Sequence, residues 1–298
     1  MDFRWLQDFL SLAEAGNFTS AAEARHSSQS AFSRRIQSLE SWLGVELIDR
    51  SRYPTALTPA GEIFRQHAAD LLKKMMDSRA ELQGEPVGDH QTITFALPHT
   101  LAISSFPQWW DAWREGVGGS SCRLLASNVH DAVTALVSGL ADVLICYHHA
   151  QQPVFLDPVQ YEKIVLGTEW LRPYAGVRPK ARLFTLPGTV KSPAPLLSYS
   201  SGAFLARMVD IILDSVPDVL HAATKCESDM ANVLLEMAIA GHGVAWLPEH
   251  TAAPAVQARQ LVRVGDDRWT LPLTICLYFD RLHKTPDVDR LTQYLADL

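Results

Sequence analysis

Residues 18–61 contain the stretch Phe18-Thr-Ser-Ala-Ala-Glu-Ala-Arg-His-Ser-Ser-Gln-Ser-Ala-Phe-Ser-Arg-Arg-Ile-Gln-Ser-Leu-Glu-Ser-Trp-Leu-Gly44, followed by Leu47-Ile-Asp-Arg50 and Leu57-Thr-Pro-Ala-Gly61. The adjacent Ala21 and Ala22 are small enough to let two helices cross closely. The second helix carries a stripe typical of a buried face, formed by Phe32, Ile36, Leu39 and Leu43. Its first turn offers donors and acceptors suited to base edges in a major groove: Gln29, Ser30, Ser33 and Arg34. This stretch predicts a helix-turn-helix that reads DNA.

A longer series of positions makes the pattern more specific than a generic helix-turn-helix. The positions are Phe9, Gly16, Phe18-Thr19, Ala21-Ala22, Ser28-Gln29, Ala31, Ser33, Leu39-Glu40, Leu43-Gly44, Arg50 and Leu57-Thr-Pro-Ala-Gly61. In order and spacing this series resembles the LysR-type transcriptional regulators. Two positions depart from the family: Ser30 stands in place of the usual proline, and Arg25 in place of the usual leucine. Ser30 gives the helix a looser start, and Arg25 either contacts phosphate or lies on the surface.

The resemblance implies a domain plan for the α/β chain. A winged helix-turn-helix DNA-binding domain is expected over residues 1–58, with Leu47–Arg50 and Thr55–Leu57 as the strands of the wing. A linker and dimerisation helix with a hinge follows over residues 59–91. Residues 92–298 are then expected to form a two-lobed effector-binding domain with a periplasmic-binding-protein-like, Rossmann-like fold. One lobe would span about 92–165 plus 267–298, and the other 166–266.

The polar side chains of the helix-turn-helix and of the wing are the predicted DNA contacts. We expect Gln29, Ser33 and Arg34 to read bases, while Arg50 and Arg52 at the wing hold phosphates. The complete predicted set is Thr19, Ser28, Gln29, Ser30, Ser33, Arg34, Arg35, Arg50 and Arg52. The formal net charge of −7 argues against a protein that coats nucleic acid. It permits a regulator with a small basic DNA surface and an acidic sensor domain.

Composition and length place the chain among ordinary globular proteins. It has 298 residues, of which 47% are hydrophobic and 20% charged, so two or more domains with their own cores are expected. The sequence shows no long apolar run and no basic-then-apolar leader at Met1-Asp-Phe-Arg-Trp5. The expectation is a cytoplasmic protein with no membrane partner.

A long amphipathic helix is predicted between Thr58 and about Gly84, with Thr58 as its cap and Pro59 in its first turn. Apolar residues at roughly heptad spacing form one stripe: Phe64, Leu71, Met75 and Leu82. We predict that this stripe pairs with the same helix of a second subunit. The alternative is a helix that lies against its own sensor domain.

Beyond a polar linker, strand and helix patterns alternate, which predicts parallel sheets with right-handed crossovers. Strands are expected at Thr92–Leu97, Cys122–Ala126 and Asp142–Cys146, with helices at Leu101–Arg114 and Val129–Val137. A second unit follows Pro158, with helices at 203–213 and 229–240 and a strand at 244–247. A last strand at 273–278 and a helix at 288–298 complete the chain.

Polar groups gather where strands end and helices begin, the usual position of ligands in such folds. The resemblance places the effector at these same turns. The predicted effector-binding residues are His99, Thr100, Ser127, Asn128, Ser198, Ser200, Ser201, Cys226, Ser228 and Met230. The alternative for each hydroxyl or amide is that it only caps a helix, and for His99 that it is structural.

Within the family, the sequence looks most like the hypochlorite-responsive regulators. The resemblance rests on His99 with the Thr-Leu that follows it, Tyr199-Ser200, Ser228-Asp-Met230 and Gly-Val-Ala-Trp-Leu-Pro-Glu249. It implies sensing by methionine oxidation, which makes an apolar side chain polar. The candidates are Met208, Met230 and Met237, with Cys226 as an alternative redox group, although helical spacing also explains Met208 and Met237 as core residues. The second hypothesis is a small organic acid held by backbone amides and serine hydroxyls.

Catalysis, metals and cofactors are not predicted. The chain lacks Gly-x-Ser-x-Gly, a P-loop, Gly-x-Gly-x-x-Gly after a strand, and His-Glu-x-x-His. Its cysteines form no Cys-x-x-Cys pair, so neither a zinc site nor a disulfide framework is expected from Cys122, Cys146, Cys226 and Cys276. The expected partners are double-stranded promoter DNA, a second copy of the chain as a homodimer or as a homotetramer on DNA, RNA polymerase, and a small effector or oxidant.

Overall fold

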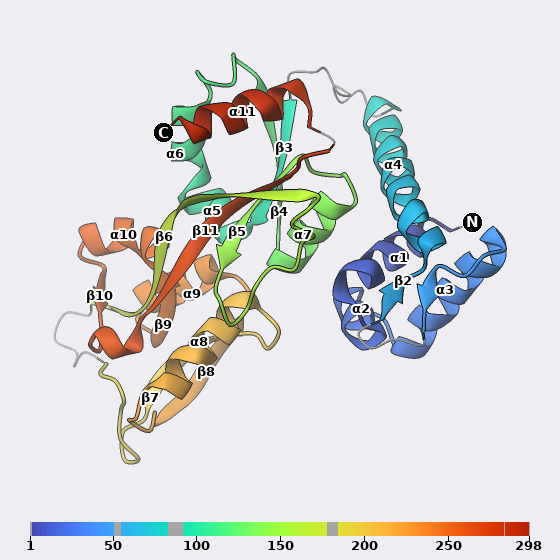
Figure 1. Cartoon of the computed structure of the whole chain (residues 1–298). Coiled ribbons are helices and arrows are strands. Elements are labelled where there is room, and N and C mark those ends of the chain that lie inside the picture. The colour runs from blue at the N-terminus through green and yellow to red at the C-terminus, as the bar shows by residue number, and fades with distance from the viewer. Residues whose placement is uncertain (1, 51–54, 83–91, 178–183, 283, 298) are drawn as a thin grey trace.

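The computed structural model describes residues 2–50, 55–82, 92–177, 184–282 and 284–297. The N-terminal part consists of α1 (Phe3–Ala15), α2 (Phe18–Ala24), α3 (Gln29–Leu43), the short strands β1 (Ile48–Asp49) and β2 (Ala56–Leu57), and α4 (Pro59–Leu82). β1 and β2 pair antiparallel. Figure 1 shows α1, α2 and α3 packed around one another with α4 along one side. This is the predicted winged helix-turn-helix followed by a long helix.

Local sequence explains where these helices begin and end. Asp2, Asn17 and Ser28 each accept a hydrogen bond from a backbone N–H in the first turn of the helix that follows. Gly16 and Gly44 end α1 and α3 in the left-handed conformation. The predicted cap of α4 is also confirmed, because Thr58 Oγ1 accepts from the Gly61 N–H at 3.0 Å.

The core of the N-terminal part is built from the stripe that the sequence predicts. Phe32, Ile36 and Leu39 of α3 are fully buried. They pack with Leu6 and Phe9 of α1, while Ala21 and Ala22 of α2 are also buried at the helix crossing. α4 joins this core through Ala68 and Leu72. The first half of α4 is therefore part of the DNA-binding domain and not a free linker.

The C-terminal part is one continuous mixed sheet. In the described residues the strand order is β4-β3-β5-β11-β6-β9-β7-β8, and β10 pairs with β6. β3 (Thr92–Pro98), β4 (Ser121–Ser127) and β5 (Val143–His148) are parallel to one another. β7 (Ala194–Tyr199), β8 (Ala222–Ser228) and β9 (Val244–Pro248) form a second parallel group. The sheet therefore has two lobes, as the resemblance implies.

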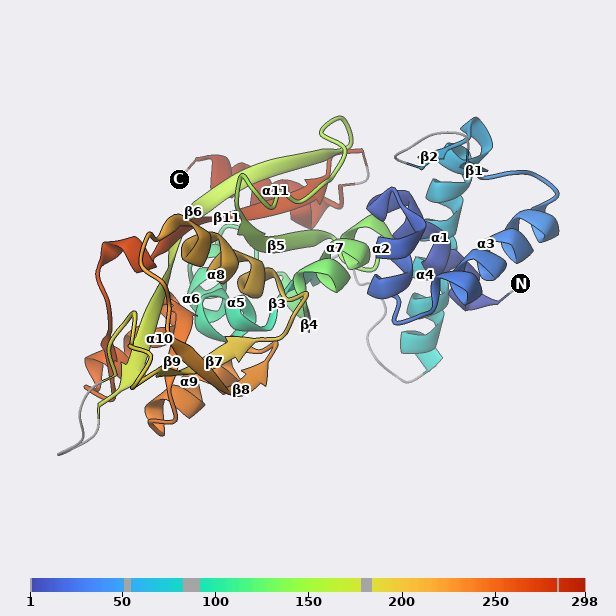
Figure 2. The same ribbon diagram turned by 90° about the horizontal axis from the view of Figure 1, so that it is seen from below.

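Helices cover the sheet (Figures 1 and 2). They are α5 (His99–Ser104), α6 (Phe106–Trp113), α7 (Val129–Val137), α8 (Phe204–Ser215), α9 (Ala231–Ile239), α10 (Glu249–Gln257) and α11 (Pro286–Ala296). The single helix predicted over Leu101–Arg114 is wrong, because α5 ends at Ser104 and α6 starts at Phe106. Pro107 explains the break, since it has no N–H to continue the ladder of a longer helix.

Two long antiparallel strands connect the lobes. β6 (Tyr161–Gly176) pairs with β11 (Leu271–Asp280) along its first part and with β9 along its last part. The register between β6 and β11 shifts between Ile275 and Cys276, which face Gly167 and Val165. One extra residue in β6 at this point is a β-bulge. The predicted lobe boundary at 165/166 falls inside β6, at this bulge.

Candidate DNA-binding surface and effector site

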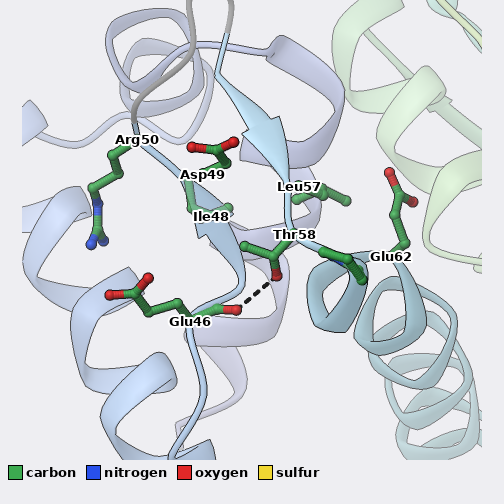
Figure 3. A pocket seen from close by; sticks show the side chains of 8 residues that line it. Glu46, Ile48, Asp49, Arg50, Leu57, Thr58 and Glu62 are labelled. Carbon is green, nitrogen blue, oxygen red and sulfur yellow. Dashed lines mark hydrogen bonds between the residues drawn. The ribbon is translucent and has the colours of Figure 1, made fainter.

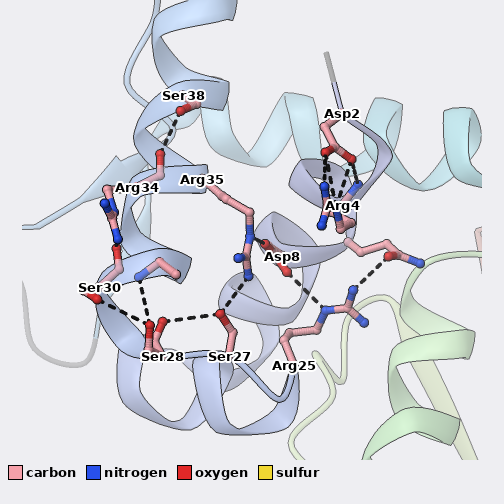
Figure 4. Close-up of polar contacts among 12 residues, drawn as sticks. Asp2, Arg4, Asp8, Arg25, Ser27, Ser28, Ser30, Arg34, Arg35 and Ser38 are labelled. Atoms are coloured by element: carbon pink, nitrogen blue, oxygen red, sulfur yellow. Dashed lines mark hydrogen bonds and ion pairs between the residues drawn. The ribbon is translucent and has the colours of Figure 1, made fainter.

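The first turns of α3 form an exposed polar face. Gln29, Ser30 and Arg34 are exposed, and Ser33 is half-buried. Ser28 Oγ caps the helix by accepting from the Ala31 N–H at 3.3 Å, and Arg34 Nε donates to the Ser30 carbonyl at 3.3 Å (Figure 4). Thr19 at the start of α2 is exposed as well. The geometry leaves these side chains accessible to a groove of DNA.

A buried carboxylate holds two arginines beside this face. Asp8 of α1 is 1% exposed and forms ion pairs with Arg25 Nε at 3.2 Å and with Arg35 Nε (Figure 4). Arg25 Nη2 also donates to Gln7 Oε1 at 2.8 Å, and Arg35 Nη2 donates to Ser27 Oγ at 3.0 Å. Arg35, predicted as a DNA contact, is therefore directed into the domain, and Arg25 is neither a simple surface residue nor a free phosphate ligand.

The wing is tied to α3 in the same way. Glu40 is buried, and its Oε1 accepts from the Leu47 and Ile48 N–H groups at 2.9 and 3.1 Å. Its Oε2 accepts from Arg50 Nη2 at 2.7 Å. Arg50, predicted to hold phosphate, thus bridges strand and helix, although its side chain is 41% exposed. Arg52 lies outside the described residues.

A groove opens on the other side of the wing. It has a volume of about 660 Å³ and is lined by Glu46, Ile48, Asp49, Arg50, Leu57, Thr58, Pro59 and Glu62. Figure 3 shows Thr58 donating to the Glu46 carbonyl, a bond of 2.7 Å, with Glu62 on the facing helix. Its three carboxylates make the groove unsuitable for phosphate. The first turn of α3, by contrast, contains no acidic residue.

The exposed apolar face of α4 differs from the predicted stripe. Phe64 packs inward, with its ring centroid 5.3 Å from that of Phe9. The exposed apolar side chains are Ile63, Leu71 and Met75, at 64%, 42% and 50% exposure. Leu71 and Met75 belong to the predicted seam, Ile63 replaces Phe64, and the side chain of Leu82 is outside the description. Heptad spacing selects residues on one side of a helix, but it does not show which side packs against the rest of the chain.

The predicted effector turns form two pairs, one in each lobe. Pro98 and Ser127 are partners at the ends of β3 and β4, so the turns that contain His99 and Asn128 lie side by side. Thr100 is buried and His99 is half-buried. Asn128 caps α7, because its Oδ1 accepts from the Asp131 N–H at 2.8 Å.

In the second lobe, Tyr199 and Ser228 are partners at the ends of β7 and β8, and the Ser200 N–H donates to the Ser228 carbonyl at 3.1 Å. Ser228 Oγ accepts from the Met230 N–H at 3.1 Å. Cys226 is half-buried and Ser201 exposed, while Ser198 Oγ lies 3.5 Å from Thr224 Oγ1. The capping alternative thus describes Asn128, whereas Ser228 bonds to the residue before α9, a helix without a side-chain cap.

Residues that the sequence analysis did not select lie where the lobes meet. The ring of Tyr147, at the end of β5, stacks on Phe204 of α8 with centroids 6.3 Å apart. The Tyr147 hydroxyl is buried and has no hydrogen-bond partner among the described residues. Burial raises the pKa of Tyr147, and the neighbouring Glu169 and Tyr199 raise it further. An unpaired buried hydroxyl is costly, which makes this position a candidate for contact with a ligand.

Glu169 lies on β6, one of the two strands that join the lobes, and its charge reaches Tyr147. It is fully buried, and Oε1 accepts from the Trp170 N–H at 2.8 Å while Oε2 lies 2.9 Å from His250 Nδ1. Thr251, the next residue of α10, has a buried hydroxyl that lacks a partner within the described part of the chain. The sequence offered little to select Glu169, because an acidic side chain within a strand is its one distinguishing feature and Glu162 of β6 shares it.

The sulfur-bearing candidates differ in accessibility. Met208 is fully buried in the core, as expected if its helical spacing marks a core residue. Met230 and Met237 are half-buried. Met230 is the residue before α9 and makes no side-chain cap. Cys146 and Cys276 are buried, and burial raises the pKa of both thiols. Met230 and Cys226 are therefore more accessible to an oxidant than these residues.

No helix in the described residues is long and apolar enough to cross a membrane.

Comparison with known proteins agrees with both halves of the fold. Residues 3–62 match the family model "Bacterial regulatory helix-turn-helix protein, lysR family", and residues 87–298 match "LysR substrate binding domain". The HTH-type transcriptional regulator YjiE of Escherichia coli K12 is 29% identical over 299 residues, covering 100% of this chain and 95% of YjiE.

Two solved structures cover the whole chain. Vibrio fischeri DarR in complex with DNA is 27% identical with a TM-score of 0.62, covering 100% of this chain and 99% of DarR. Full-length HypT from Salmonella typhimurium, a hypochlorite-specific LysR-type transcriptional regulator, is 28% identical with a TM-score of 0.59 and complete coverage of both chains. Matched to the family along nearly its whole length, this chain belongs to the LysR-type transcriptional regulators, which are DNA-binding proteins with an effector-binding domain and not enzymes.

Proposed function

We propose that the chain reads promoter DNA through Gln29, Ser30, Ser33 and Arg34, with Thr19 and Ser28 at the edge of the same surface. The observation that carries this assignment is that three arginines of the domain are held in ion pairs while Arg34 is not among them. Asp8 and Glu40 engage Arg25, Arg35 and Arg50, whereas Arg34 is exposed on the leading face of α3. An exposed guanidinium at this position can make a bidentate contact with a guanine edge.

Replacing Arg34 with alanine is expected to cost roughly 1–3 kcal/mol at one base position and to relax specificity there. Binding sites are first selected from random duplexes with the full-length protein, and affinities are then measured by fluorescence anisotropy on singly substituted duplexes. Arg114→Ala is the matched control, since Arg114 is 62% exposed in the effector domain. An Arg34→Ala protein with the base preference and affinity of wild type would contradict the proposed docking.

We further propose that the active form is a homodimer whose subunits pair through Ile63, Leu71 and Met75. The support is the exposure of these three side chains along one face of α4, next to the acidic wing groove. Two reading heads would then face two half-sites of a palindrome. A tetramer on DNA, contact with RNA polymerase and action in the cytoplasm complete the proposal.

For the effector, we propose that oxidation at Met230 changes how the lobes pack. Met230 is half-buried beside the turn that joins β8 to α9, and the similar protein HypT is described as hypochlorite-specific. A sulfoxide would place a polar group in a packed site. The second candidate effector is a small polar metabolite, which is favoured by the buried hydroxyls of Tyr147 and Thr251, neither of which has a hydrogen-bond partner in the part of the chain that the structure describes. Either effector must bind or stabilise one lobe geometry better than the other.

A Met230→Gln substitution, which mimics the polarity of the sulfoxide, is expected to change promoter output several-fold without abolishing DNA binding. The double variant Met230→Ile with Cys226→Ala is expected to lose its response to hypochlorite in a reporter strain. Met237→Ile serves as the control, since Met237 is a half-buried core neighbour. A normal hypochlorite response in the double variant would remove redox sensing at this turn and leave the metabolite as the effector.

A further inference from the structure

Helix α7 presents one face to its own lobe and another toward the DNA-binding domain, with Val137 at the border between the two. Ala132, Val133 and Leu136 are buried in the lobe core. His130, Thr134 and Val137 follow the spacing i, i+4 and i+7, and so share a different face. In Figure 2, α7 lies against α1 and α2 of the DNA-binding domain. The contact is polar at its centre, where Thr134 Oγ1 donates to Glu14 Oε2 at 3.2 Å.

A second hydrogen bond crosses between the same two domains. Arg65 Nη2 of α4 donates to Gln160 Oε1 at 3.2 Å, and Gln160 Nε2 in turn donates to Asp280 Oδ2 at 2.8 Å. Between the two contacts lies a cavity of about 320 Å³, lined by Ala13, Glu14, Arg65, Val137, Phe155, Leu156, Asp157 and Tyr161. The two domains therefore meet over a defined surface with residues from both on its walls.

The other end of α7 is part of the proposed effector site. Asn128 caps its first turn, and Ser127 ends β4 immediately before it. The helix has nine residues, so its two ends are separated by roughly 13 Å at the usual helical rise. A short helix of this kind moves as one rigid element. Displacement of its capped end therefore displaces the face that contacts the DNA-binding domain.

We propose that α7 is the relay of this regulator: its N-terminal turn senses the effector site, and its His130–Thr134–Val137 face docks the DNA-binding domain of the same chain. This proposal rests on the proposed effector site at the strand ends. The contact between this face of α7 and the DNA-binding domain is called the dock below. In Figures 1 and 2, α3 lies on the side of its domain away from α7, so the dock leaves the proposed DNA-binding face of α3 uncovered. The dock sets the orientation of α3 and does not block DNA.

His130 supports the relay because charges from three parts of the molecule reach it. Burial lowers the pKa of His130, Asp131 raises it, and the positive charges of Arg25, His26 and Arg207 lower it. Arg25 and His26 belong to the DNA-binding domain, and Arg207 lies on α8 in the second lobe. His130 Nε2 is buried without a hydrogen-bond partner among the described residues. His130, a residue of the dock, therefore also lies close to the second lobe.

Glu14 makes the dock sensitive to protons. Burial raises the pKa of Glu14 from its ordinary value of 4.5 to about 8; the nearby Asp131 also raises it, and the hydrogen bond from Thr134 lowers it. The other ionisable residues around the cavity are Arg65 on α4, Asp157 before β6 and Tyr161 at its start. The docked form therefore holds a proton that the separated form releases. Docking is strongest in acid and weakens as the pH rises from about 4.5 to about 8.

The dock is tested by single-molecule energy transfer within one chain. Full-length protein carries dyes at positions 42 and 282, where Trp42 and Leu282 are exposed in the two domains, and the dyes are attached to genetically encoded azide side chains so that all cysteines stay native. An excess of unlabelled protein ensures that only intrachain pairs are observed. The ratio of docked to separated chains should fall on the order of tenfold between pH 6.5 and 8.5. Glu14→Gln should remove this dependence and keep the docked state at high pH.

The relay is tested in the same assay by removing helix caps. Asn128→Ala should lower the docked-to-separated ratio roughly fivefold, because the first turn of α7 frays. Thr285→Ala is the matched control: Thr285 Oγ1 caps α11 by accepting from the Val288 N–H at 3.3 Å, and this variant should leave docking unchanged. Equal pH dependence in Glu14→Gln and wild type overturns the dock, and wild-type docking in Asn128→Ala overturns the relay. DNA affinity of the unsubstituted protein is measured in parallel: a protein that docks but binds no selected duplex refutes the proposed function alone, and a protein that binds its duplex without pH-dependent docking refutes the dock alone.

Discussion

An Asp8→Ala protein should lose about 3–5 kcal/mol of stability in its DNA-binding domain. Asp8 is 1% exposed and is the shared partner of Arg25 and Arg35, whose side chains are only 28% and 25% exposed. Its removal leaves two partly buried guanidinium groups without a counter-charge, next to the start of the recognition helix. The measurement is hydrogen exchange of peptides from residues 3–48 in the full-length protein at increasing urea.

Asp111→Ala provides the comparison. Asp111 pairs with Arg114 at 3.8 Å, and both side chains are more than half exposed, so its loss should change stability by less than about 1 kcal/mol. Equal effects of the two substitutions would show that Asp8 does not hold the domain together. A rescue is also expected: adding Arg35→Met to Asp8→Ala removes one unpaired charge and should restore part of the lost stability.

Leu71→Glu should raise the dissociation constant of the dimer on the order of 100-fold, because symmetry places a carboxylate from each subunit in the seam. Leu71 is 42% exposed, so the substitution leaves the fold of the single subunit intact. Sedimentation velocity over a range of protein concentrations measures the change.

Leu71→Met keeps the apolar surface and should sediment as wild type. Ile63→Glu should act like Leu71→Glu, since Ile63 is 64% exposed on the same face of α4. Unchanged sedimentation of both glutamate variants would exclude this face from the dimer.

The parts of the structure that sequence predicts well are those specified by local rules. The α3 stripe of Phe32, Ile36 and Leu39 is buried as its spacing predicts, and α7 spans the predicted Val129–Val137. The cap at Thr58 is present as predicted, because a cap is satisfied by N–H groups within three residues.

The parts that sequence does not predict depend on partners far along the chain. Arg35 meets Asp8 across 27 positions, so nothing near Arg35 indicates that it is engaged. Arg65 and Gln160 are 95 positions apart. Local sequence patterns therefore could not show that Arg35 is engaged within its domain, or that Arg65 contacts the effector domain. The strand β6 was missed as well, since its 16 residues pair in turn with three strands, β11, β9 and β10, that lie more than 60 positions further along the chain.

The lobe contacts were unpredictable for a related reason. Tyr147 ends an apolar strand in one lobe and Phe204 begins a helix in the other, so each has an ordinary local setting. Their stacking, and the unpaired Tyr147 hydroxyl, exist only once the two lobes fold against each other. The polar turns predicted as the effector site are present, but the hydroxyls that lack partners are next to them.

The continuous ladder of β6 and β11 limits how far the lobes can move. Paired antiparallel strands resist bending in the plane of their hydrogen bonds but twist readily, and a bulge concentrates that twist. The bulge opposite Ile275 and Cys276, beside Gly167, interrupts the regular ladder and is therefore a point where twist can concentrate. The connection between the lobes therefore favours a twisting motion over hinge closure. A change in one lobe can then reach the other as a twist that preserves the hydrogen bonds of these two strands.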